Sequence, residues 1–179
     1  GAVKSVMMLK VIGSLLVIMT SACGGIVAAE HIRDQYEQMR YLQKLIYRLR
    51  SEIFYSRAYL GEAFQQIAVS SKDPYKSWMK QLAEQTKRRT GGVFSIIWEE
   101  NTQKYLADVG LPKDVLDRLL ALGGQFGIAD IEMQVRTLDL YLEELNLSME
   151  ERHETMNSRI RLYRCLGVMS GIFVTILLI

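Results

Sequence analysis

The sequence is poor in the residues that build cross-linked and metal-bound frameworks. Among 179 residues it has two cysteines, two histidines and two prolines. Cys23 and Cys165 both lie in apolar stretches, and so few ligands support neither a disulfide framework nor a zinc site, so both are expected to be small apolar residues. No alternation of apolar and polar residues persists, which disfavours strands. We therefore predict an all-α fold.

Recognisable catalytic signatures are also missing. The sequence contains no phosphate-binding Walker loop and no Gly-x-Ser-x-Gly nucleophile motif. Glu150 and His153 form one Glu-x-x-His pair, and a di-iron helical bundle needs two such pairs, so a solvated helix face is favoured over a di-iron enzyme. We predict that the protein is not an enzyme and uses no metal or other cofactor.

Positive charge is not concentrated enough to indicate a nucleic-acid partner. The formal net charge is only +2. The run Lys87-Arg88-Arg89 stands at the expected end of a helix, where basic side chains interact favourably with the helix dipole. Because the chain lacks a broader basic surface, no nucleic acid is predicted as a partner.

An uncharged apolar stretch stands near each end of the chain. Val11 to Ala29 is about long enough to cross a bilayer core of ~30 Å. The second stretch, residues 165–179, is short for a crossing because it corresponds to only about 22 Å of helix. Basic residues crowd the inner flanks, with Arg33 and Arg40 after the first stretch and Arg159 and Arg164 before the second. The positive-inside rule then places the middle of the chain in the cytoplasm.

These features predict four segments. Residues 1–7 are a tag or start-site extension, since Met8-Leu9-Lys10 is a natural beginning. Residues 8–29 are a transmembrane anchor, residues 30–164 a cytoplasmic helical bundle, and residues 165–179 a second transmembrane anchor. The predicted architecture is a six-helix bundle head between N-terminal and C-terminal transmembrane helices.

The N-terminal stretch has two alternative interpretations. Ser21-Ala22-Cys23-Gly24 resembles a lipoprotein processing site, although Thr20 occupies a position that usually carries Leu, Val or Ile. Val27-Ala28-Ala29 fits a small-residue signal-peptidase site. Either cleavage would export the domain, so the alternative function is an exported, lipoprotein-like helical binding module anchored through Cys23. The length of the stretch and the basic residues after it favour the continuous anchor.

The first and last helices are predicted to be long and amphipathic. The first runs from Glu30 to about Ser56, and the last begins at Asp130 and runs to Ile179. Both carry apolar residues at alternating three- and four-residue steps, which form one seam along a helix. The seam residues are Ile32, Tyr36, Met39, Leu42, Leu45, Leu49 and Ile53 in the first helix, and Ile131, Val135, Leu138, Leu142, Leu145, Met149, Met156, Ile160 and Tyr163 in the last.

Capping signals separate four shorter helices between these two. Ser56, Asp73 and Asp130 are expected N-caps of the second, third and last helices, and Pro112 begins the fifth. Gly123 and Gly124 are expected to end the fifth helix. The expected inward residues are Tyr59, Leu60, Phe64 and Ile67; Trp78, Leu82 and Thr86; Val93, Phe94, Ile97, Trp98, Tyr105 and Leu106; and Val115, Leu116, Leu119, Leu120 and Leu122.

Several stretches together resemble the stage III sporulation protein AB family of endospore-forming bacteria. They are Met8–Gly13, Glu52–Tyr55, Leu60–Ala63, Trp98, Leu122-Gly123, Phe126-Gly127, Asp130, Gln134 and Leu166–Gly171. One departure is Ala58-Tyr59-Leu60, where the family commonly has Thr-Pro-Leu, so the start of the second helix is expected to be capped differently.

The resemblance implies a membrane component of the sporulation channel complex between mother cell and forespore. The family is also similar to inner-membrane platform proteins of type II secretion, whose cytoplasmic helical domains sit near an ATPase. By this analogy the chain would be a non-enzymatic scaffold in the mother-cell membrane around the forespore. Its expected partners are the membrane, other proteins of the channel complex including its ATPase, and other copies of itself.

A glycine-rich stretch before the last helix is the predicted docking site. Glycines allow unusual backbone angles and close approach of another backbone, although a tight connection between two helices is an equally good interpretation. The predicted partner-binding residues are Gly123, Gly124, Phe126, Gly127, Asp130 and Gln134.

Overall fold

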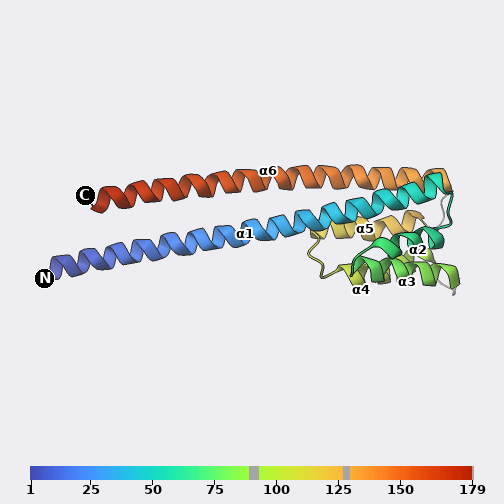
Figure 1. Cartoon of the computed structure of the whole chain (residues 1–179), viewed down its shortest axis with the longest axis horizontal. Coiled ribbons are helices and arrows are strands. Elements are labelled where there is room, and N and C mark those ends of the chain that lie inside the picture. The colour runs from blue at the N-terminus through green and yellow to red at the C-terminus, as the bar shows by residue number, and fades with distance from the viewer. Residues whose placement is uncertain (89–92, 127–129, 179) are drawn as a thin grey trace. The chain divides into compact units, whose positions relative to one another are not determined.

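The structure is a computed structural model of the chain, and it describes residues 1–88, 93–126 and 130–178. Within these ranges all regular secondary structure is helical, which confirms the predicted all-α fold. The helices also match the predicted number and order. They are α1 (Ala2–Tyr55), α2 (Leu60–Ser70), α3 (Tyr75–Arg88), α4 (Phe94–Leu106), α5 (Lys113–Phe126) and α6 (Ile131–Leu178) (Figure 1).

The chain divides into two compact units, each described here by itself. The first combines Gly1–Asp34 with Arg152–Ile179, and the second is Gln35–Glu151. We call the second unit the head. The long helices α1 and α6 contribute to both units, whereas α2 to α5 belong to the head alone.

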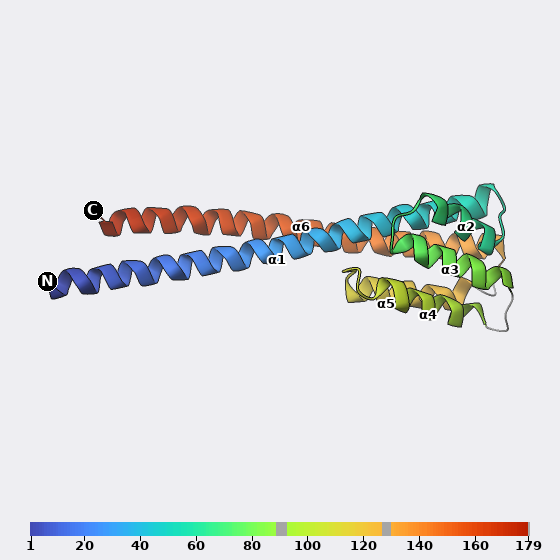
Figure 2. The same ribbon diagram turned by 60° about the horizontal axis from the view of Figure 1, so that its bottom comes forward.

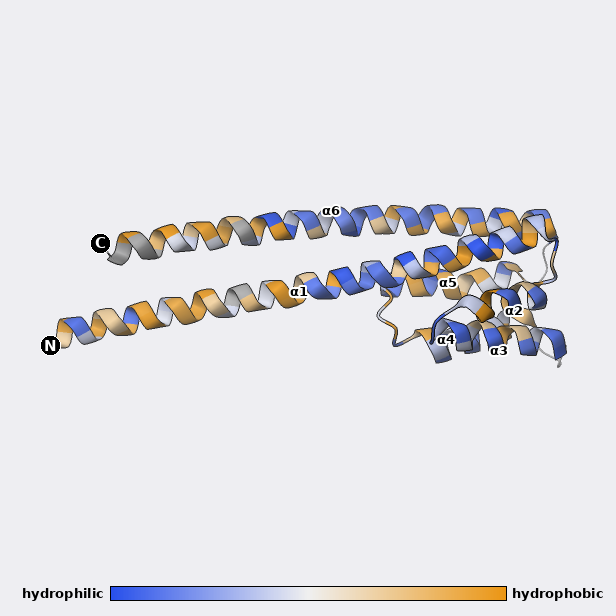
Figure 3. Ribbon diagram, in the orientation of Figure 1, coloured by the Kyte–Doolittle hydropathy of each residue, from blue (hydrophilic) through white to orange (hydrophobic). Residues whose placement is uncertain are grey.

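The first unit contains the apolar part of α1. Among the described residues, α1 is the one helix long and apolar enough to cross a membrane, and this part is almost entirely unburied. Figure 3 shows its apolar residues along the helix. The same length and composition suit an N-terminal signal sequence, so processing before Cys23 or Glu30 stays an alternative. The helix suggests a membrane association, while a crossing by the C-terminal segment stays a prediction.

Within the first unit α1 and α6 approach each other closely at Gly25. A Cβ atom on Gly25 would lie 2.4 to 2.8 Å from three ring carbons of Tyr163. Real Cβ contacts are essentially never that short, so a side chain at position 25 would have to displace the Tyr163 ring. Tyr163 thereby packs on the facing helix, as its place in the predicted seam suggested.

The core of the head is built largely by the two predicted seams. Most seam positions of α1 and α6 in this unit are buried, because a row at three- and four-residue steps stays on one side of a helix. Ile131 is an exception, with 36% of its surface exposed. The buried seam residues are Met39, Leu42, Leu45, Leu49 and Ile53 on α1, and Val135, Leu138, Leu142, Leu145 and Met149 on α6.

The shorter helices close the core in sequence order. α2 packs against α3, α3 against α4, and α4 against α5 (Figure 2). Aromatic side chains meet at the centre, where the Trp98 ring lies 5.3 Å from Trp78 and 6.1 Å from Phe126, with the last pair stacked. Both indole groups donate hydrogen bonds, Trp98 to the carbonyl of Leu119 at 2.7 Å and Trp78 to the hydroxyl of Thr102 at 3.2 Å. The buried indole N–H group of each tryptophan therefore has a hydrogen-bond partner.

Polar side chains join α1 to α6 beside the buried seams. Gln43 donates a hydrogen bond to Asn146, and the Arg50 guanidinium binds both carboxylate oxygens of Asp139. The hydrogen bond to Asp139 raises the pKa of Arg50. Because the ion pair is partly exposed to water, it contributes little to the free energy of unfolding. Its main effect is to align the two helices.

Two helix boundaries differ from those predicted. α2 begins at Leu60 after Tyr59, which makes no side-chain capping bond, whereas Ser56 donates to the Glu52 carboxylate within α1.

α5 continues through Gly123 and Gly124 to Phe126. Contacts from the packed bundle thus override the weak stop signal of glycine in a helix. The cap predicted for Asp130 is confirmed, since its carboxylate accepts from the backbone N–H group of Met133. Asp73 lies two residues before the start of α3, and its carboxylate accepts from the backbone N–H group of Ser77.

The buried Tyr141 hydroxyl offers a test of the core. This residue of α6 is only 5% exposed, and its hydroxyl has no hydrogen-bond partner among the described residues. Burial also raises the pKa of Tyr141 well above its usual range, because the interior disfavours the phenolate.

We expect Tyr141→Phe to leave the free energy of unfolding at pH 7 unchanged or raise it by about 1 kcal/mol, because it removes an unsatisfied polar group. Above pH ~10 only the unfolded state ionises this tyrosine, so the wild-type head loses stability as pH rises. The variant should lose less between pH 9 and pH 11, as urea titrations would measure. A loss of more than 1 kcal/mol at pH 7 would show that the hydroxyl is bonded.

Candidate docking site

The six predicted partner-binding residues do not form one surface. Gly123 and Phe126 are buried in the head, where they contact or stack on Trp98. Their burial corrects the expectation that they lie on an exposed loop and gives both a packing role. Gly124 is exposed on α5, and Gly127 lies outside the described residues. Asp130 and Gln134 line the same groove.

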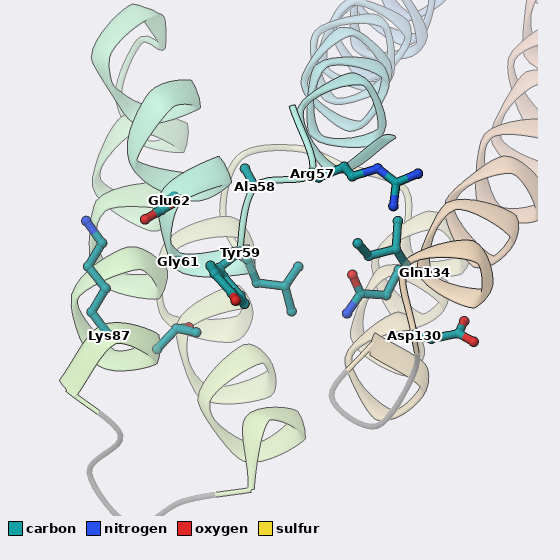
Figure 4. Close-up of a pocket in the computed structure, with 11 residues that line it drawn as sticks. Arg57, Ala58, Tyr59, Gly61, Glu62, Lys87, Asp130 and Gln134 are labelled. Carbon is teal, nitrogen blue, oxygen red and sulfur yellow. The ribbon is translucent and has the colours of Figure 1, made fainter. Parts of the chain in front are cut away.

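That groove, which we call the tip groove, lies between the α1–α2 connection, the end of α3 and the start of α6. Its volume is about 800 Å³. Figure 4 shows Tyr59 between Glu62 and Lys87 on one side and Gln134 on the other. The lining residues are Arg57, Ala58, Tyr59, Leu60, Gly61, Glu62, Thr86, Lys87, Asp130, Ile131 and Gln134.

The α1–α2 connection holds an uncommon backbone conformation at Arg57. Its φ is 47°, which places a long side chain in the left-handed region that favours glycine. The neighbouring residues are bonded on both sides, since the Ala58 N–H donates to the Glu52 carbonyl and the Tyr59 carbonyl accepts from Glu62 at 2.8 Å. The connection is therefore set by its surroundings, and backbone strain of this kind is often associated with function.

The opposite wall of the tip groove is fixed by the start of α6. The Asp130 carboxylate accepts from the Met133 N–H at 2.9 Å, and Gln134 donates to the Phe126 carbonyl at 3.2 Å. Asp130 is exposed at the same time, so it can cap the helix and still contact a partner.

A second groove of about 610 Å³ adjoins the first and shares Arg57 and Ile131 with it. It lies between the end of α1 and the start of α6. The remaining lining residues are Phe54, Tyr55, Glu132, Val135, Arg136 and Asp139. The two grooves adjoin at Arg57 and Ile131, and we call them together the tip site.

Exposed aromatic residues stand around the tip site. Tyr59 is 83% exposed, Tyr55 77% and Phe54 49%. Tyrosine and arginine are enriched among residues that carry binding energy in protein interfaces, because each combines apolar area with polar groups. The charges are mixed, with Arg57 and Lys87 opposite in sign to Glu62 and Asp130. The composition suits a protein partner better than a polyanion.

Sequence reasoning placed Tyr59 in the core, and its exposure was missed. The residue lies directly before the first turn of α2, where the three- and four-residue pattern of that helix does not apply. The departure from Thr-Pro-Leu at Ala58-Tyr59-Leu60 was the available signal. Tyr59 stands at the N-cap of α2 and makes no side-chain capping bond.

Among the described ranges, no three His, Cys, Asp or Glu side chains are grouped as metal ligands. Cys23 and Cys165 are both exposed free thiols in the first unit. The tip site is therefore the feature of the head that we interpret functionally.

Comparisons with known proteins agree on one family. The family model described as stage III sporulation protein AB matches residues 10–179. A protein of that name from Bacillus subtilis (strain 168) is 24% identical over 171 residues, which cover 96% of this chain and 99% of the relative. A solved structure of stage III sporulation protein AB covers 69% of this chain and 97% of its own, with a TM-score of 0.61 and 24% identity. That similarity shows a shared fold.

Proposed function

The chain belongs to the stage III sporulation protein AB family, and we propose that it is a non-enzymatic membrane platform of the channel between mother cell and forespore. In this proposal α1 and the C-terminal segment anchor the protein in the mother-cell membrane around the forespore. The head faces the cytoplasm and holds the ATPase of the complex against the membrane rings.

The tip site is the observation that carries this proposal. A platform needs a rigid surface that a partner can contact, and two adjoining grooves with exposed Tyr55 and Tyr59 supply one. Its walls come from α1, α2, α3 and α6, so a partner bound there would contact four elements held by the common core. The basic flanks of the apolar α1 segment support the cytoplasmic orientation.

We expect Tyr59→Ala to reduce co-purification of the channel ATPase with the full-length protein about tenfold, as loss of an aromatic anchor does in many interfaces. Asp130→Asn should weaken binding less, because the amide oxygen keeps the helix cap while the charge is lost. Val69→Ala is the matched control, since Val69 is 72% exposed but lies at the other end of α2. The measurements are pull-down from solubilised membranes and spore counts in a host lacking its own copy.

Unchanged co-purification with Tyr59→Ala and with Arg57→Ala would overturn the tip site as the docking surface. A tag inserted after Pro74 tests the orientation separately. Protection of this tag from protease in intact cells is expected. Cleavage of the tag, together with mass lost ahead of Cys23, would instead support an exported module.

A further inference from the structure

The outer face of α1 and α6 in the head has a pattern that the core does not explain. The contacts Gln43–Asn146 and Arg50–Asp139 define where the two helices meet. On each helix this contact row has a buried row on one side and an exposed row on the other. Because both buried rows face the core, both exposed rows lie on the opposite side, which we call the outer face.

Large apolar side chains recur on the outer face every seven residues. Tyr47 and Phe54 on α1 are 46% and 49% exposed, and Met133, Leu140 and Leu147 on α6 are 54%, 54% and 62% exposed. A seven-residue spacing keeps side chains on one stripe of a helix and is the repeat of helix-to-helix interfaces. The stripe is therefore suited to pack against further helices.

The charges of the outer face differ between the two helices. Basic residues predominate on α1, which exposes Arg40 and Lys44 as well as Glu37, and acidic residues predominate on α6, which exposes Glu143, Glu144 and Glu150 as well as Arg136. A mainly basic half and a mainly acidic half thus lie side by side around the apolar stripe. A uniformly basic partner would be repelled by Arg40 and Lys44, and a uniformly acidic partner would be repelled by the three glutamates. The surface that complements both halves is a second copy of the same face, turned by a two-fold rotation.

We propose that the outer face is the interface of a homodimer whose two-fold axis runs parallel to α1 and α6. This rotation places α1 of each copy against α6 of the partner, so basic residues face acidic ones twice. Both copies of α1 then run in the same direction, as two copies inserted in one membrane with the same orientation require. The dimer goes beyond the proposed platform function; its interface does not include the tip groove, although Phe54 also lines the second groove of the tip site.

The heights of the residues along the helices fit this arrangement. The axis preserves height, so the intrachain contacts Gln43–Asn146 and Arg50–Asp139 also set which levels face each other between copies. Arg40 then stands within one residue, or about 1.5 Å, of the level of Glu150 in the partner subunit. Lys44 similarly meets the level of Glu144 of the partner subunit. The opposite charges thus align without sliding the copies.

The apolar residues interlock at the same register. Tyr47 falls between the levels of Leu140 and Leu147 of the partner subunit, as judged from the same intrachain contacts. Phe54 falls between the levels of Met133 and Leu140 of the partner subunit. Each aromatic ring therefore faces the space between two aliphatic side chains, which is the arrangement of knobs in holes.

Cysteine cross-linking of the full-length protein in membranes tests the geometry. Two differently tagged copies carry Cys23→Ser and Cys165→Ser, one with Arg40→Cys and the other with Glu150→Cys. Oxidation should give a cross-linked heterodimer. Arg40→Cys in both copies is the matched control, with at least tenfold lower yield expected because the rotation separates those positions. Equal yields from the two pairs, or no cross-link from the first, would overturn the proposal.

Charge reversal tests the complementarity with the same membranes. Lys44→Glu or Glu144→Lys alone should reduce the dimer fraction roughly tenfold through like-charge contacts, and the double variant should restore it. Lys80→Glu, an exposed change on α3, is the control. Single-molecule photobleaching supplies the readout, and a monomeric wild type would overturn the proposal. ATPase co-purification should persist in all these variants, which separates failure of the dimer from failure of the tip site.

Discussion

Phe126→Ala is expected to destabilise the head by about 3–5 kcal/mol, the usual cost of removing a phenyl ring from a packed core. Phe126 is fully buried, stacks on Trp98 at 6.1 Å with an interplanar angle of 7°, and lies 6.4 Å from Phe94. No neighbour can fill the space of its ring without breaking these contacts, so the substitution leaves a cavity. The last residue of α5 therefore anchors that helix to the aromatic centre.

Urea titration followed by tryptophan fluorescence measures this loss. The chain has two tryptophans, Trp78 and Trp98, and both lie in the head, so the signal reports this unit alone. Gln125→Ala is the matched control, because the neighbouring Gln125 is exposed and should change stability by less than about 0.5 kcal/mol. An unchanged midpoint for Phe126→Ala, with reduced ATPase binding, would return this residue to the docking surface.

Gly123→Ala and Gly124→Ala are expected to shift stability in opposite directions. A Cβ atom at Gly123 would lie 2.3 Å from Cδ1 and 2.7 Å from Cβ of Trp98, so the indole or the helix must move. The Trp98 hydrogen bond to the Leu119 carbonyl would be strained at the same time. We expect Gly123→Ala to cost about 1–3 kcal/mol as an overpacked core position.

The neighbouring glycine has the same helical setting without the contact. A Cβ atom at Gly124 would meet no atom within 4 Å, so Gly124→Ala should stabilise the head by about 0.5–1 kcal/mol through helix propensity. The same urea titrations give both values. If the two variants behave alike, the close approach of α5 to Trp98 is not a property of the folded head.

These two predictions bear on function as well as stability. The residues that first suggested a docking loop divide into Gly123 and Phe126, which hold α5 to the core, and Asp130 and Gln134, which line the tip groove. Variants of the first pair would impair sporulation by unfolding the head. Variants at Tyr59 or Asp130 would act with the head folded. Measuring stability alongside ATPase binding separates these two causes.

The periodic features of the fold could be predicted from the sequence. The seams of α1 and α6, the all-α class and the cap at Asp130 depend on residues close together in sequence, whose geometry a helix repeats at each turn. The apolar residues from Val11 to Ala29 likewise predict an exposed apolar helix. This prediction does not depend on which segments pack beside the helix. Recognition of the family rested on ordered short motifs, which folding does not change.

The sequence does not predict the role of a residue when that role depends on a neighbour far away in the chain. Glycine is a sign of a helix end and also of close helix packing, and only the position of Trp98 assigns Gly123 to the second role. Tyr59 faces solvent because the α1–α2 connection turns at Arg57. The pattern of apolar residues does not predict the backbone conformation at this turn. Helical repeats are local, whereas grooves and close contacts arise where segments far apart in the chain meet.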